Sequence, residues 1–163
     1  MCVCRTCGLL FISEGAGGSR FRAVPERYVR LEADVAAPWE LMDIPVGIAF
    51  FFLNSALGRV AALYPSPAGA TESLLPLEAW PDLVTRHPLL ATLAPDVEAV
   101  LLRRMRGVHE TFIVPIDACY ELAGLVRRHW RGFDGGEDAA DALDGFFDRV
   151  RDRSEACAAA AAS

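Results

Sequence analysis

The sequence contains no lysine, so all 16 of its basic residues are arginine. No rule of folding requires this, and such a bias is commonly the product of GC-rich coding, so it points to the genome rather than to a mechanism. Acidic residues outnumber the arginines, 22 to 16, and give a net charge of −6. Because such a surface repels phosphates, we expect no nucleic acid partner.

Long apolar runs are also missing. The longest spans residues 44–53, well short of the roughly 20 residues that a membrane-spanning helix needs. Met1 is not followed by an apolar signal segment. We therefore expect no membrane span and a cytoplasmic protein.

The chain has 163 residues, of which 53% are apolar, enough for one domain with a sizeable core. We expect a single α+β domain over residues 1–155. The alanine-rich segment 156–163 has low complexity and is expected to be a disordered tail.

The order of apolar and turn residues predicts three hairpins. Their strands are expected at residues 9–13 and 20–24, 48–53 and 58–64, and 97–105 and 110–116, with a further strand at 28–33. The fold class expected from this order is a mostly antiparallel sheet of hairpins packed against three or four helices.

Four segments have helical patterns. Residues 39–43 and 77–86 predict short helices, and Asp117 is placed to N-cap a longer one. Apolar residues recur with helical spacing in that helix and in the last one, which follows Gly136. These stripes consist of Cys119, Leu122, Ala123, Val126 and Trp130, and of Leu143, Phe146, Phe147 and Val150.

The sharpest chemical signal is the cluster of Cys2, Cys4 and Cys7 at the N-terminus. Cys4 and Cys7 form a Cys-x-x-Cys pair followed by glycine, which is typical of a zinc or rubredoxin knuckle, and Cys2 is a candidate third ligand. A closed tetrahedral site needs four ligands, but the other thiols are Cys119, on an expected core face, and Cys157, in the tail. Residues 1–8 thus resemble half of a zinc knuckle, an incomplete site for zinc or iron.

Two other interpretations of this cluster stay open. The knuckle is vestigial in the first. In the second, Cys4 and Cys7 form a redox-active dithiol, although Gly8 leads into an expected strand rather than into the helix of a thioredoxin motif.

Residues 65–76 are rich in proline, serine, threonine and glycine and predict an ordered loop after a buried strand. The polar side chains of this region make it the best candidate for a binding surface: Tyr64, Ser66, Thr71, Glu72 and Ser73. The alternative is a turn whose side chains hydrogen-bond to their own backbone. No Walker or Rossmann pattern supports nucleotide binding.

His109 and Cys119 form a second candidate site, since the strand bearing the histidine runs into the helix bearing the cysteine. Together they could act as base and nucleophile. The alternative is a cysteine that only packs in the core, as cysteines often do.

Five strings of the sequence together resemble an uncharacterised actinobacterial family, domain of unknown function 5947. They are CVCRTC at residues 2–7, IPVGIAFFF at 44–52, YPSPAGATESLLP at 64–76, VPID at 114–117 and HWRG at 129–132. The resemblance runs from residue 2 to about residue 150. Members commonly lie in gene clusters for uptake NiFe hydrogenases, which implies an accessory or maturation role and a hydrogenase subunit or maturation factor as partner.

This chain departs from the family pattern at its N-terminus, since members typically carry another Cys-x-x-Cys pair upstream of the segment matching residues 2–7. Met1 is then an internal methionine, or the gene has lost its first segment. We expect the upstream reading frame to encode the missing pair within a few dozen residues. An in-frame stop codon there would contradict this hypothesis.

Three functions are expected in order. The first is a non-catalytic accessory protein of the hydrogenase, with the knuckle as a structural clamp. The second is a small rubredoxin-like redox carrier with iron or zinc. The third is an enzyme of unknown class that uses Cys119 or the carboxylates of Glu72 and Asp117.

Overall fold

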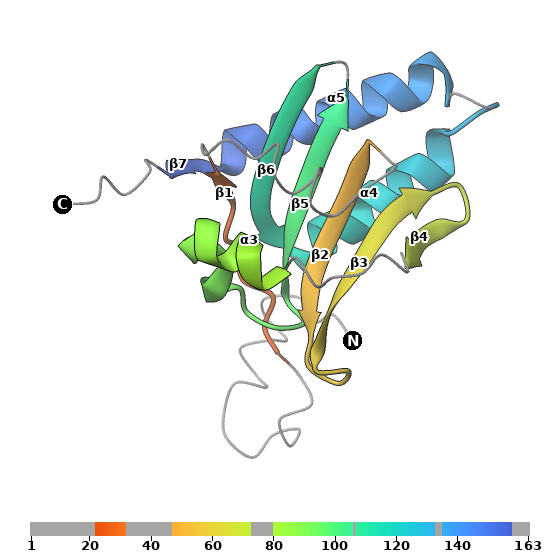
Figure 1. The fold of residues 1–163 in the computed structure, drawn as a ribbon. Coiled ribbons are helices and arrows are strands. Elements are labelled where there is room, and N and C mark those ends of the chain that lie inside the picture. The colour runs from red at the N-terminus through yellow and green to blue at the C-terminus, as the bar shows by residue number, and fades with distance from the viewer. Residues whose placement is uncertain (1–21, 32–46, 73–79, 106, 133–134, 158–163) are drawn as a thin grey trace.

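The computed structural model describes residues 22–31, 47–72, 80–105, 107–132 and 135–157, the last three of them as backbone only. These residues form an α+β fold in which helices cover both faces of one sheet (Figure 1). The elements in chain order are β1 (Val29–Leu31), β2 (Ile48–Asn54), β3 (Arg59–Ser66), β4 (Gly69–Glu72), α3 (Trp80–Arg86), the 3-10 helix η2 (Pro88–Thr92), β5 (Glu98–Met105), β6 (Val108–Pro115), α4 (Ile116–His129), α5 (Gly136–Arg153) and β7 (Glu155–Cys157).

The sheet has seven strands in the order β4-β3-β2-β5-β6-β1-β7. Every neighbouring pair is antiparallel except β1 and β7, which are parallel. The predicted hairpins β2–β3 and β5–β6 are both present, so the expectation of an α+β fold with a mostly antiparallel sheet is confirmed.

Alternate residues of the central strands belong to two separate cores, because successive side chains of a strand point to opposite faces. Phe50 and Leu101 pack with α4 and α5 on one face of the sheet. Their neighbours Phe51 and Leu102 pack with α3 and η2 on the other. These strands are buried on both faces, which explains their near-continuous apolar runs.

The apolar stripes predicted for the two long helices are confirmed. Buried residues of α4 include Cys119, Leu122, Ala123 and Val126, and those of α5 include Leu143, Phe146, Phe147 and Val150. Trp130 follows α4 and packs against the same core. A Cβ at Gly135 would lie 3.0 Å from the indole ring of Trp130, so glycine is needed where the chain enters α5.

Asp117 is not the N-cap of α4. The helix begins at Ile116, and Pro115 is its N-cap residue without a capping side chain. The N–H of Ile116 donates instead to the carbonyl of Val97, at 2.9 Å, so a partner from the loop before β5 replaces a local cap. Asp117 lies exposed in the first turn, where its charge favours the helix dipole.

Both ends of the described chain differ from expectation. Residues 22–24, expected in a strand, have no strand structure, and β7 occupies residues 156–157, expected to be part of the tail. The expected strand 9–13 and helix 39–43 lie outside the described residues, as do residues 20–21 and 77–79 of two further predicted elements.

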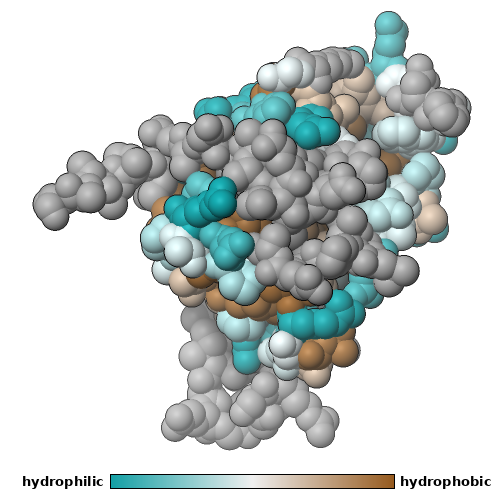
Figure 2. Space-filling model, viewed as in Figure 1, coloured by the Kyte–Doolittle hydropathy of each residue, from teal (hydrophilic) through white to brown (hydrophobic). Residues whose placement is uncertain are grey.

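No helix within the described ranges is long and apolar enough to cross a membrane. The face that carries α3 shows hydrophilic and apolar residues side by side in its described part (Figure 2). This face is therefore neither uniformly charged nor uniformly apolar.

Asp96 joins the loop before β5 to the tip of the β2–β3 hairpin. Its Oδ1 accepts a hydrogen bond of 2.8 Å from the N–H of Ser55, and its own N–H donates to the carbonyl of Leu53 at 2.9 Å. Its φ of 68° lies in the left-handed region, which aspartate and asparagine tolerate better than most residues. Burial raises the pKa of Asp96, but the hydrogen bonds from Ser55 and the charge of Arg22 outweigh it and leave the pKa below its ordinary value.

Replacing Asp96 by asparagine keeps the left-handed backbone but removes the charge. We expect Asp96→Asn to cost about 1 kcal/mol of unfolding free energy at pH 7. A carboxylate with a lowered pKa stabilises the fold above its unfolded pKa of about 3.9, and this contribution is lost as the pH falls below that value. Urea unfolding between pH 7 and pH 2.5 should show the difference shrinking below pH 4. Asp141→Asn, at an exposed position of α5, is the control, and a pH-independent difference would contradict this account.

Candidate functional site

The expected binding residues lie on a hairpin and not on a loop. Tyr64 and Ser66 end β3, Thr71 and Glu72 end β4, and Tyr64 pairs with Thr71 in the register. The prediction of a loop over residues 65–76 is therefore wrong for 65–66 and 69–72. Pro65 lies beyond the part of β3 that pairs with β2, so its missing N–H costs no ladder bond on that side.

The hydroxyl groups of this hairpin bond to the hairpin itself. Ser66 Oγ lies 3.0 Å from both the carbonyl oxygen of Gly69 and Thr71 Oγ1, and it accepts from the N–H of Ala68 at 3.2 Å. Glu72 forms an exposed ion pair of 2.8 Å with Arg59. This geometry is the self-bonded turn that we gave as the alternative. Ligand binding here stays a prediction, and Ser73 lies outside the described residues.

The cysteine cluster of Cys2, Cys4 and Cys7 also lies outside the described residues, so the half-knuckle and its metal stay predictions. Within the part that the structure describes, no group of three or more histidine, cysteine or carboxylate side chains is placed to hold a metal ion.

Cys119 and His109 do not form a catalytic pair. Cys119 is fully buried, and burial together with the charge of Asp117 raises the pKa of its thiol far above neutrality. His109 is exposed at the opposite end of β6, where it pairs with Arg104. About six residues of strand, roughly 20 Å, separate it from the start of α4. The interpretation of Cys119 as a core residue is confirmed.

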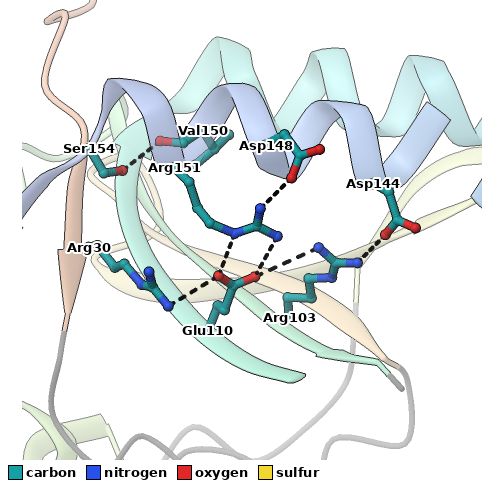
Figure 3. Close-up of polar contacts among 8 residues, drawn as sticks. All are labelled: Arg30, Arg103, Glu110, Asp144, Asp148, Val150, Arg151 and Ser154. Atoms are coloured by element: carbon teal, nitrogen blue, oxygen red, sulfur yellow. Dashed lines mark hydrogen bonds and ion pairs between the residues drawn. The ribbon is translucent and has the colours of Figure 1, made fainter. Parts of the chain in front are cut away.

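The main polar constellation of the described residues surrounds Glu110, a carboxylate of β6 whose side chain is only 2% exposed (Figure 3). Arg151 of α5 donates to both carboxylate oxygens, at 2.7 and 3.3 Å. Arg30 of β1 lies 3.4 Å from Oε1, and Arg103 of β5 lies 3.7 Å from Oε2. One carboxylate thus joins two strands and a helix to β6.

Two further acids of α5 complete this Glu110 network. Asp144 pairs with Arg103 and Asp148 pairs with Arg151, so three carboxylates balance three guanidinium groups. Arg103 also lies over the ring of Phe147, 4.5 Å from its centroid. The hydrogen bond with Glu110 raises the pKa of Arg151, which keeps this guanidinium charged throughout the physiological pH range.

Sequence reasoning missed this network, although one signal for it was present. Arg103 and Glu110 are direct cross-strand partners about the predicted turn at residues 106–107, and they are charged residues within otherwise apolar strands. A charged pair opposite each other at such positions indicates a buried ion pair. The partners from β1 and α5 could not be identified in this way, because their positions depend on tertiary packing.

The Glu110 network is suited to holding elements together rather than to chemistry. Charge-assisted hydrogen bonds to several guanidinium groups stabilise the ionised carboxylate, which makes it a poor general base. A shallow pocket nearby is lined by Tyr28 and residues of α4 and α5. Its two arginines already have partners, since Arg149 pairs with Glu121 and Arg153 donates to the hydroxyl of Tyr28.

We expect Glu110→Gln to lower the unfolding free energy by about 2–4 kcal/mol, because it leaves buried guanidinium charge without its counter-charge. Asp148→Asn is the matched control: the side chain of Asp148 is 64% exposed, and its loss should cost less than about 1 kcal/mol. Urea unfolding at pH 7 measures both. Equal effects of the two substitutions would refute a central role for Glu110.

A search of the curated proteins finds no significant match to this chain, and neither does a search of the solved structures. A family model does match, over residues 1–154, and it describes a family of unknown function. The matched region includes the cysteine cluster and every element of the fold up to the end of α5. The chain therefore belongs to the family of unknown function DUF5947.

Proposed function

We propose that this protein is a non-catalytic accessory or maturation protein of an uptake NiFe hydrogenase in the cytoplasm of an actinobacterium. It acts by binding a hydrogenase subunit or a maturation factor, with residues 1–8 as part of a structural metal knuckle. The link to hydrogenase rests on the gene clusters in which members of the family commonly lie. The structure contributes the way in which the described residues use their reactive groups.

The observation that carries the non-catalytic assignment is the burial and pairing of these groups. The thiol of Cys119 is fully buried with a raised pKa, so little nucleophilic thiolate forms near neutral pH. The carboxylate of Glu110 is enclosed by guanidinium groups, and Glu72 pairs with Arg59. Residues that an enzyme would need accessible are therefore used to hold the fold together, which favours a role in binding.

The knuckle would serve as a clamp on the chain that precedes the sheet. Cys4 and Cys7 have the spacing of a knuckle, and Cys2 adds a candidate third thiolate. Zinc is the ion that a closed tetrahedral thiolate site most often holds in a structural role. A Cys-x-x-Cys pair upstream would complete the site as the second half of a zinc ribbon.

A redox carrier is the second candidate, since a Cys-x-x-Cys-Gly turn is also the form of a rubredoxin knuckle. Iron held by four thiolates would make the protein coloured and give it a reversible reduction potential. Such a protein would pass single electrons to or from the hydrogenase.

Elemental analysis of the reduced protein separates these candidates. We expect stoichiometric zinc in a form extended upstream to include the second Cys-x-x-Cys pair, and loss of that zinc in Cys4→Ser and Cys7→Ser. Cys119→Ala is the matched control, because this thiol lies in the core and its loss should leave the metal content unchanged. Stoichiometric iron would favour the redox carrier, and no metal in the extended form would refute the knuckle.

The accessory role itself is tested by binding. The extended protein, immobilised through its C-terminus, should bind one purified hydrogenase subunit or maturation factor saturably. Binding should weaken in Cys4→Ser and persist in Cys119→Ala. Failure of every subunit and maturation factor of the gene cluster to bind would refute the role.

A further inference from the structure

The outer surface of α4 is a single exposed face on the side of the sheet opposite α3 (Figure 1). Its exposed residues recur every three or four positions, the spacing of one helix face: Asp117, Tyr120, Glu121, Gly124, Arg127 and Arg128. We call this set the α4 face. Tyr120 is 50% exposed although its ring also contacts Phe50 edge-on.

Charges on the α4 face are separated along the helix. The acids Asp117 and Glu121 lie in its first half, and the bases Arg127 and Arg128 lie in its second half. The helix dipole favours this order and is sufficient to explain it. It does not explain the half-exposed tyrosine or the glycine between the two halves.

Gly124 has no reason within this chain to be glycine. A Cβ built at this position would meet nothing within 4 Å, and the residue has helical backbone geometry without a positive φ. Glycine in the middle of a helix is less stable than alanine, so it is retained where another backbone must come close. The absent side chain leaves the α4 face bare at its centre.

We propose that the α4 face is an interface between two copies of this chain, whose α4 helices pack antiparallel about a two-fold axis at Gly124. Residues equally distant from Gly124 then lie level across the axis. Glu121 lies opposite Arg127 of the second copy, each three residues from the glycine. Tyr120 lies opposite Arg128, which places a guanidinium against an aromatic ring.

The outermost residues fit the same arrangement. Asp117 lies seven residues before Gly124, and Arg131 lies seven residues after it, just beyond the helix. Arg131 is exposed, and its long side chain can reach back toward the acid of the second copy. Every charged residue of the α4 face, together with Arg131, thus acquires an opposite charge across the axis.

A second copy fits this surface better than an unrelated acidic partner does. An acidic partner would meet the bases but also the acids Asp117 and Glu121. A two-fold axis requires a self-complementary surface, and the two halves of the α4 face are complementary to each other at equal distances from the centre. The dimer goes beyond the accessory role and does not depend on it.

The contact should be weak and sensitive to salt. A single pair of helices buries less than the roughly 1,200 Å² of a standard interface. Exposed charge pairs are screened by salt, and each copy carries a net charge of −6. Glu121 also pairs with Arg149 of its own chain at 2.9 Å, and both side chains are 53% exposed, so the carboxylate remains accessible to a second guanidinium.

Sedimentation equilibrium of the full chain in reducing buffer tests the dimer. We expect a reversible monomer–dimer equilibrium in about 20 mM salt that shifts toward monomer by about tenfold in about 300 mM salt. Glu121→Arg and Arg127→Glu should each weaken the dimer by at least about tenfold, because each places like charges opposite each other on both sides of the axis.

Mixing these two variants is the decisive measurement. In a mixed pair, Arg at position 121 of one copy faces Glu at position 127 of the other, and the native Arg127 and Glu121 face each other on the second side. Dimer should therefore return in the mixture and in the double variant. Circular dichroism and thermal melts establish that each variant is folded.

Three controls separate this contact from general effects. Asp82→Arg and Arg86→Glu make the same changes of charge on α3, on the opposite face of the sheet, and should leave the dimer unchanged. Arg149→Ala removes the internal partner of Glu121 and should not weaken the dimer. Gly124→Ala should raise the melting temperature by a few degrees and weaken the dimer by at least about tenfold, because its methyl group lies on the axis.

Monomeric wild-type protein at every concentration in low salt would overturn the proposal and leave the accessory role untouched. A mixture of the two charge variants that stays monomeric while the wild type dimerises would overturn it too, as would an unaffected dimer in Gly124→Ala.

Discussion

The Glu110 carboxylate is the interaction on which the arrangement of the other elements depends. Moving a carboxylate from water into a protein core costs several kcal/mol, which is offset only where counter-charges and hydrogen bonds meet it with good geometry. Arg103, Arg30 and Arg151 supply them from β5, β1 and α5. Because these three elements are far apart in the sequence, the charge is satisfied only when the sheet and α5 have assembled together.

This constraint complements the apolar cores, which are less selective. Alternation along β2 and β5 gives the sheet two buried faces, and many apolar packings satisfy such faces about equally well. A one-residue shift of β6 against β5 would move Glu110 to the face that α3 covers, away from Arg103 and from α5. The Glu110 network therefore penalises alternative registers that the apolar residues alone would tolerate.

Local periodicity made most of the described fold predictable, and non-local contacts explain the failures. The hairpins β2–β3 and β5–β6 and the buried stripes of α4 and α5 follow from patterns within single segments. The strand β4 was missed because Pro65 and its small polar neighbours are typical of a loop, whereas pairing with β3 decides the structure. The N-cap at Asp117 was wrong because Val97, distant in sequence, accepts the hydrogen bond of Ile116.

The candidate site divides in the same way. Sequence could propose Cys2, Cys4 and Cys7, and it could recognise Cys119 as a core residue, since both inferences use local spacing. The Arg103–Glu110 pair was also accessible, through the register of a predicted hairpin. Arg30 and Arg151 were not, because no short-range pattern links them to Glu110.

The distribution of polar groups also constrains how the protein can act. Buried charges are consumed in internal pairs, and the fully buried thiol lies in the core, so the described residues meet other molecules through exposed side chains. On α4 these side chains have an order that the fold does not require, with a bare glycine between an acidic and a basic half. A stable fold would gain from alanine at that position, so the glycine indicates selection for contact rather than for stability.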